Sequence, residues 1–61
     1  MIARVLTTKG MTMPMSTLMM QLTKCWPGDP YAVQKAAGSI GGAVHNAFIK
    51  IGINGMVTRI R

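Results

Sequence analysis

Residues 37–48 read Ala-Gly-Ser-Ile-Gly-Gly-Ala-Val-His-Asn-Ala-Phe, and the predicted fold depends most on these twelve residues. Gly38 suits the position just after a helix, and Ser39 is a favoured cap for the next helix. Apolar residues then recur from position 40 to position 51 at the spacing of one helix face. The stretch therefore predicts a helix that ends at Gly38 and an amphipathic helix over 40–51.

The flanking segments predict the other elements of a small domain. Pro14 suits a first helical turn, and apolar residues at 15, 18, 19 and 22 mark one face of a helix over 14–24. Trp26-Pro27-Gly28 stops that helix, and Asp29-Pro30 starts the next one, over 30–37. β-branched residues predict strands over 2–6 and 56–61, which we expect to pair because a lone strand leaves its backbone groups unpaired.

One signal competes with the helix over 40–51. Asn54-Gly55 between two apolar stretches is typical of a β-hairpin, which would make residues 48–53 a strand. The helical period favours the helix, although Gly52 weakens its last turn. Whether 48–53 ends a helix or starts a hairpin stays open at this point.

Charge and composition narrow the function. The 61 residues include seven Lys and Arg against a single acidic residue, Asp29, which gives a formal net charge of +6. A chain without acidic patches suits a polyanionic partner. One histidine, one cysteine and one carboxylate supply neither a carboxylate pair nor a set of metal ligands, so we expect no enzyme activity, metal or cofactor. No small-molecule ligand is evident.

Size and cysteine content suggest where and how the chain works. A core of this size is marginal, so we expect a homodimer or a larger protein assembly. Cys25 is the only cysteine and cannot form an intramolecular disulfide, which favours the cytoplasm. No stretch approaches the roughly 20 apolar residues of a membrane span, so we expect no membrane partner.

Two short helices joined at a glycine form a helix-turn-helix. Residues 37–48 resemble that motif in small phage repressors, with Gly38 in the turn and Val44 and Ala47 buried. Residues 47–59 are similar to the end of a recognition helix and the first wing strand of winged-helix regulators. The resemblance implies a single α+β domain over 1–61, with a three-helix helix-turn-helix core and a two-stranded β element. It also implies sequence-specific binding of double-stranded DNA by a small transcriptional regulator.

The candidate DNA-binding residues combine base readers, glycines and cations. Asn46 can make a bidentate amide contact to adenine, and His45 can contact a base or a phosphate. Gly41 and Gly42 would let the start of the helix, with its free N–H groups, approach a phosphate closely. The full set is Lys35, Ser39, Gly41, Gly42, His45, Asn46, Lys50, Arg59 and Arg61.

The alternative function is a protein-protein interaction module, an inhibitor or adaptor, that uses the same helical surface. Its basicity would then serve an acidic partner. Met11, Met13 and Met20 could add an adaptable hydrophobic surface for another chain, because methionine repacks easily against irregular partners. The sequence names neither the target DNA nor the protein partner.

Overall fold

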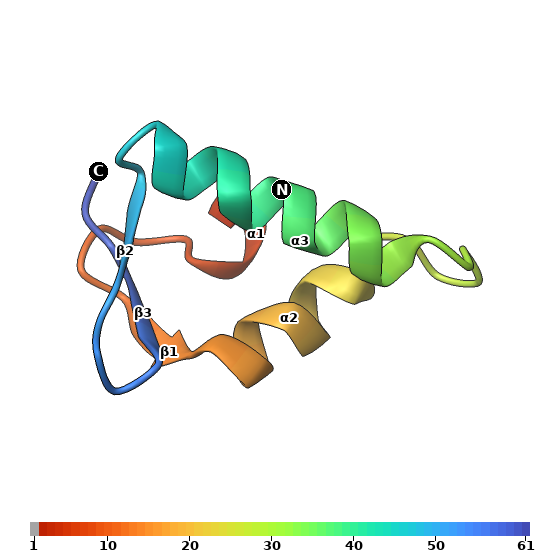
Figure 1. Cartoon of the computed structure of the whole chain (residues 1–61), viewed down its shortest axis with the longest axis horizontal. Helices are drawn as coiled ribbons and strands as arrows, with labels where there is room; N and C mark the ends of the chain where they lie inside the picture. The colour runs from red at the N-terminus through yellow and green to blue at the C-terminus, as the bar shows by residue number, and fades with distance from the viewer. Residues whose placement is uncertain (1) are drawn as a thin grey trace.

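The computed structural model describes residues 2–61 as a small α+β domain (Figure 1). Its elements in chain order are α1 (Ile2–Val5), β1 (Thr12–Pro14), α2 (Met15–Thr23), α3 (Ala32–His45), β2 (Ile49–Ile51) and β3 (Met56–Arg59). The strands form an antiparallel sheet in the order β1-β3-β2, which lies at one end of the α2–α3 pair (Figure 1). The fully buried large side chains come from the residue after α1 and from α2, β2 and β3: Leu6, Leu18, Leu22, Ile49 and Val57.

Helix α2 confirms the helix predicted over 14–24. Leu18 and Leu22 have no solvent exposure, and Met15 and Met19 pack half-buried against the same core. These four positions lie on one helical face, so burial of that face against α3 stabilises a helix of only nine residues. Pro14 has extended geometry and ends β1 at the residue before the helix starts.

Helix α3 corrects the prediction of two separate helices over 30–37 and 40–51. One helix runs without interruption through Gly38. Ala36, Ile40 and Ala43 are all buried, so the apolar face continues across the glycine at helical spacing. A glycine inside a helix costs only about 1 kcal/mol relative to alanine, and the packing of this continuous face outweighs it.

The helix ends at His45 in a Schellman motif. Ala47 has a positive φ of 56°, its N–H donates to Val44 O (3.1 Å), and the N–H of Phe48 donates to Ala43 O (2.8 Å). The left-handed position that commonly carries glycine is thus occupied by an alanine. The glycine at position 38, which the sequence placed at a helix end, lies in the helix interior.

The strand interpretation of residues 48–53 is the correct one. Strand β2 pairs with β3, with Lys50 opposite Thr58, and Gly52–Gly55 form the connection. The extension of the preceding helix to residue 51 is therefore wrong, and the sheet has three strands instead of two.

The strand predicted over 2–6 is also wrong, because α1 occupies this segment. Ile2 and Leu6 are both buried, four residues apart, and the N–H of Leu6 donates to Ile2 O (2.9 Å). A helical turn places both side chains on the same side of the segment, where both are buried. Both edges of β3 are already paired, one with β1 and one with β2, so neither edge is left for residues 2–6. The predicted backbone pairing of 2–6 with 56–61 does not form.

Candidate nucleic-acid interface

The outward face of α3 carries few large side chains. Gln34 and His45 are exposed eleven residues apart, about 16 Å along the axis, and lie close to one line on the helix surface. Between them lie exposed glycines at 38, 41 and 42, and no other described side chain comes within 4 Å of where a Cβ would be added there. Alanine would fit at all three positions, so internal packing does not account for these glycines.

The position of Gly41 and Gly42 corrects one part of the predicted site. Both lie deep inside α3, where each N–H belongs to the helical hydrogen-bond ladder, and the helix starts at Ala32. They cannot present free N–H groups to a phosphate, although they do leave the backbone accessible from outside. Ser39 is half-buried and lies toward the core side of the helix.

Two residues that the phage-repressor motif places in the core are not there. Val44 is 42% exposed, and Ala47 is exposed in the left-handed position beyond the helix. Gly38 lies within α3 and makes no turn. The assignment of these three residues to a helix-turn-helix is therefore wrong, and the turn between the helices lies over 24–31 instead.

Lys35 takes part in an ion pair at the start of α3. Its ammonium group forms a hydrogen-bonded ion pair with Asp29 Oδ2, and Asp29 Oδ1 accepts the N–H of Tyr31 (2.8 Å). The hydrogen bond from Lys35, and then that from the Tyr31 N–H, lowers the pKa of Asp29 below its usual 3.8. This pair stabilises the turn that enters α3 and partly neutralises one predicted phosphate contact.

His45, Asn46 and Arg61 come together at the other end of α3. Asn46 follows the last helical residue, and its backbone carbonyl oxygen accepts a hydrogen bond from Arg61 Nη1 (3.0 Å). A guanidinium group carries five N–H donors, so this contact leaves donors for a phosphate. Here the structure does bring together a predicted base reader and a predicted phosphate contact.

Arg59 has a different environment from the other predicted cations. Its guanidinium carbon lies 4.6 Å from the centre of the Phe48 ring, and Nη1 donates to Leu6 O (2.8 Å). Its Nε is buried without a hydrogen-bond partner among residues 2–61. The side chain therefore serves to join β3 to the segment after α1 and is poorly placed for a phosphate.

Lys50 lies at a shallow hollow of about 500 Å³. Thr12, on β1, and Thr58, on β3, also line this hollow, and their hydroxyl groups are 2.9 Å apart. Opposite strand positions share one sheet face, so the register of Lys50 with Thr58 and of Thr58 with Thr12 places the three side chains in one row. Hydroxyl and ammonium groups are common phosphate donors, and of these three residues only Lys50 is predicted from the sequence.

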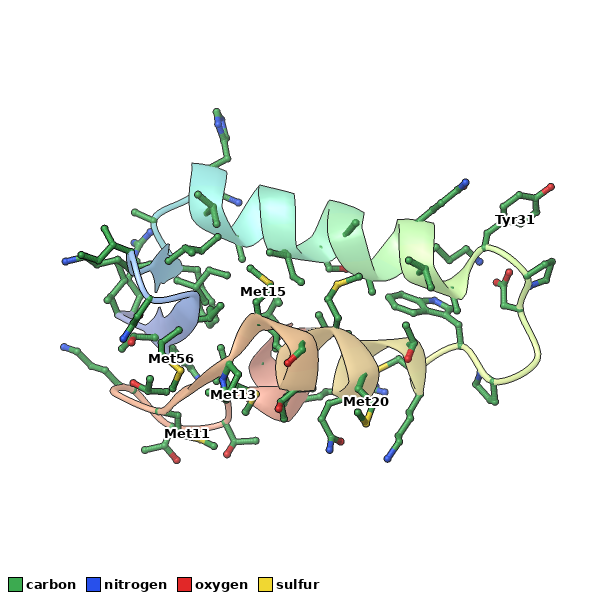
Figure 2. The ribbon with its side chains drawn as sticks, turned by 60° about the horizontal axis from the view of Figure 1, so that its bottom comes forward. Met11, Met13, Met15, Met20, Tyr31 and Met56 are labelled. Carbon is green, nitrogen blue, oxygen red and sulfur yellow. The ribbon has the colours of Figure 1, made fainter. Side chains whose placement is uncertain are left out.

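The three methionines are not equally exposed. Met11 and Met13 pack half-buried against the core, whereas Met20 on α2 is 59% exposed (Figure 2).

The site residues not predicted from the sequence are Gln34 and the paired threonines, Thr12 and Thr58. The placement of Gln34 depends on the uninterrupted α3, and that of the threonines depends on the strand register.

Comparison of the chain with protein-family models, with curated proteins and with solved structures finds no match. Among residues 2–61, none of the helices has the length and apolar character needed to cross a membrane. The same residues contain no cluster of three His, Cys, Asp or Glu side chains that could hold a metal ion.

Proposed function

We propose that this chain binds double-stranded DNA and acts as a small transcriptional regulator, with the outward face of α3 in the major groove. One observation carries the proposal: Gln34 and His45 lie at the two ends of a glycine-rich helix surface, where no side chain covers the backbone. The major groove is about 12 Å wide and admits an α-helix. A helix with so little side-chain bulk can approach base edges closely, with an amide and an imidazole at its two ends.

Exposed cations supply the affinity, and one of them, Arg61, lies at the C-terminal end of α3, where it contacts Asn46 O. Lys50 and Arg61 are exposed, and Asp29, the only acidic residue of the sequence, is paired with Lys35. Arg4, Lys9 and Lys24 are also exposed, on other parts of the surface. Each Lys or Arg that meets a phosphate releases counterions, which adds affinity without sequence preference.

The order of elements supports the same proposal. Helices α2 and α3 are followed by the β2–β3 hairpin, which is the order of helices and wing that the winged-helix resemblance implies. The connection between the helices, residues 24–31, is longer than the three or four residues of a simple helix-turn-helix. The support therefore lies in the element order and in the surface of α3, and the residues 37–48 do not contribute to it as a turn.

A pair of glutamine variants tests the placement of α3. Gln34→Ala should weaken binding to a duplex selected from a random library by about tenfold, and it should change binding to unselected DNA little. Gln21→Ala, on the exposed surface of α2, is the matched control and should change neither. Equal losses on both duplexes for Gln34→Ala would show that this amide reads no base.

One observation favours the second candidate, a protein-protein interaction module. Val33 and Val44 are 61% and 42% exposed on one side of the α3 surface, with Ala37 between them. Small residues flanked by valines allow two helices to approach closely. If the chain binds no duplex at low salt, this apolar side of α3 becomes the leading candidate for a contact surface.

A further inference from the structure

The sheet packs one face against the helices and turns the other face to solvent. Thr58 lies at the centre of this outer face. Across the strands, Thr12 and Lys50 are its neighbours on the two sides. Along the chain, Met56 and Ile60 lie two residues before and after it, and alternate residues of a strand share one face. A polar row and an apolar row therefore cross at Thr58.

The shallow hollow of about 500 Å³ lies on this outer face, beside Gly52. Small-molecule sites commonly have volumes of roughly 300–1,000 Å³. Gly52 lies opposite Met56, and its N–H donates to Met56 O (2.8 Å). A Cβ at this position would meet Asn54 Oδ1 at 3.0 Å. The glycine therefore leaves the hollow open and lets the Asn54 amide lie at its edge.

Every polar side chain that lines the hollow can donate a hydrogen bond. Lys50 carries an ammonium group that has no ion pair among residues 2–61. Asn54 Oδ1 accepts the N–H of Met56 (3.1 Å), so its NH₂ group takes no part in that bond and can donate to a ligand. The hydroxyl oxygens of Thr12 and Thr58 are 2.9 Å apart. When Thr12 donates to Thr58, the Thr58 hydroxyl hydrogen is left for a ligand next to Lys50.

Charge and apolar surface together define the ligand that fits this lining. Asp29, the only acidic residue, pairs with Lys35 at the start of α3, so no acidic side chain competes with a ligand for Lys50. One ammonium group matches one negative charge. Ile60 is 38% exposed, and the sulfur of a methionine such as Met56 makes favourable contacts with aromatic rings. The lining therefore matches a singly charged oxyanion joined to an aromatic body.

We infer that the outer hollow of the sheet binds a small aromatic carboxylate. Its carboxylate accepts hydrogen bonds from Lys50, Thr58 and the Asn54 amide, and its ring lies against Met56 and Ile60. A nucleic-acid phosphodiester carries the same single charge and can meet Lys50, but it has no apolar body for the other two side chains. The inference does not rest on the proposed DNA binding, because the hollow lies on the sheet and not on α3.

An NMR titration of the ¹⁵N-labelled chain with 2-naphthoate tests this site. The probe should shift the Thr58 backbone amide and the Asn54 side-chain amide in a saturable way, with a Kd on the order of 1 mM for a ligand of this size. The neutral 2-naphthamide has the same ring without the charge. It should bind at least about tenfold more weakly, because it cannot form charge-assisted hydrogen bonds as an acceptor.

Three variants assign the contacts within the hollow. Lys50→Met keeps a long side chain, removes the charge and should weaken 2-naphthoate binding at least about tenfold. Thr58→Val keeps the β-branched shape, removes the hydroxyl and should weaken binding about fivefold. Lys24→Met makes the same change at an exposed lysine just after α2 and should leave the Kd unchanged. Melting temperatures of the three variants show whether the fold persists.

The contrary outcomes are distinct from those of the proposed function. Equal binding of 2-naphthoate and 2-naphthamide, or equal affinity of Lys50→Met and wild type for 2-naphthoate, would overturn the inference. If a short duplex shifts Thr58 and the Asn54 side-chain amide while 2-naphthoate does not, the hollow belongs to a nucleic-acid phosphate and the carboxylate is wrong. Each of these results leaves the test of α3 by Gln34→Ala unaffected.

Discussion

Arg59 stacks on Phe48 at 4.6 Å and also donates a hydrogen bond to the carbonyl of Leu6, so one side chain joins three parts of the domain. Phe48 lies between α3 and β2, and Leu6 follows α1. The segment 2–6 takes no part in the sheet, and this arginine provides a direct hydrogen bond from β3 to the residue that follows α1.

Arg59→Ala should therefore act on stability more than on DNA binding. Loss of a charged hydrogen bond and of the ring contact should lower the free energy of unfolding by about 2 kcal/mol. Arg61→Ala, whose side chain is exposed, should change it by less than about 0.5 kcal/mol. Urea unfolding of the two variants decides the matter, and equal stability losses would show that the Arg59 contacts contribute little.

Ala47→Gly should stabilise the domain. Ala47 has a φ of 56° at the end of α3, a conformation that glycine adopts without the steric penalty of a Cβ. We expect the free energy of unfolding to rise by about 1 kcal/mol, and Ala37→Gly, inside the same helix, to lower it by about as much. Thermal melting compares the two variants. A lower melting temperature for Ala47→Gly than for wild type would mean that α3 does not end in a Schellman motif.

Two neighbouring substitutions test the orientation of α3. Ala43 is buried and Val44 is 42% exposed. Ala43→Asp places an unpaired charge in the core and should cost more than about 4 kcal/mol, which unfolds a domain of this size. Val44→Asp should cost less than about 1 kcal/mol, mainly from a negative charge near the helix C-terminus. Circular dichroism that shows Ala43→Asp folded and Val44→Asp unfolded would reverse the assigned face.

The ion pair of Asp29 with Lys35 should make stability depend on pH in the acid range. The folded-state pKa of Asp29 is lowered, so its contribution is complete above the unfolded value near 3.8 and is lost as the pH falls through the folded-state pKa. Asp29→Asn keeps a side-chain oxygen for the Tyr31 N–H and removes the charge. The difference in melting temperature between wild type and Asp29→Asn should be present at neutral pH and vanish in strong acid. A difference that stays constant would show that the pair adds no stability.

The elements that the sequence predicted correctly have strong local signals. Leu18 and Leu22 repeat at helical spacing within one short segment, and the β-branched residues after Gly55 predict the strand that forms β3. These signals are local, so they survive when other parts of the chain are misassigned. The Asn54-Gly55 signal is also local, but the helical period over 40–51 favours a helix in its place, and that preference is wrong.

The missed elements depend on contacts between distant segments. Gly38 is a plausible helix end locally, and only the burial of Ala36, Ile40 and Ala43 along one face shows that the helix continues. The role of Arg59 depends on Leu6, 53 residues away, and the row of Thr12, Thr58 and Lys50 depends on strand register. Gln34 becomes a candidate base reader only when α3 is continuous.

The salt dependence of duplex binding tests DNA recognition most directly. Lys50→Ala and Lys35→Ala serve as matched variants, because each removes one positive charge. If about four cations meet phosphates, wild-type affinity should fall on the order of a hundredfold between about 50 and 200 mM salt. Lys50→Ala should make the negative slope of log affinity against log salt less steep by about one, because Lys50 forms no ion pair among residues 2–61. Lys35→Ala should change the slope little, because Asp29 already pairs with that lysine. Absence of binding to any duplex at low salt, or an equal effect of the two substitutions on the slope, would contradict the proposed interface.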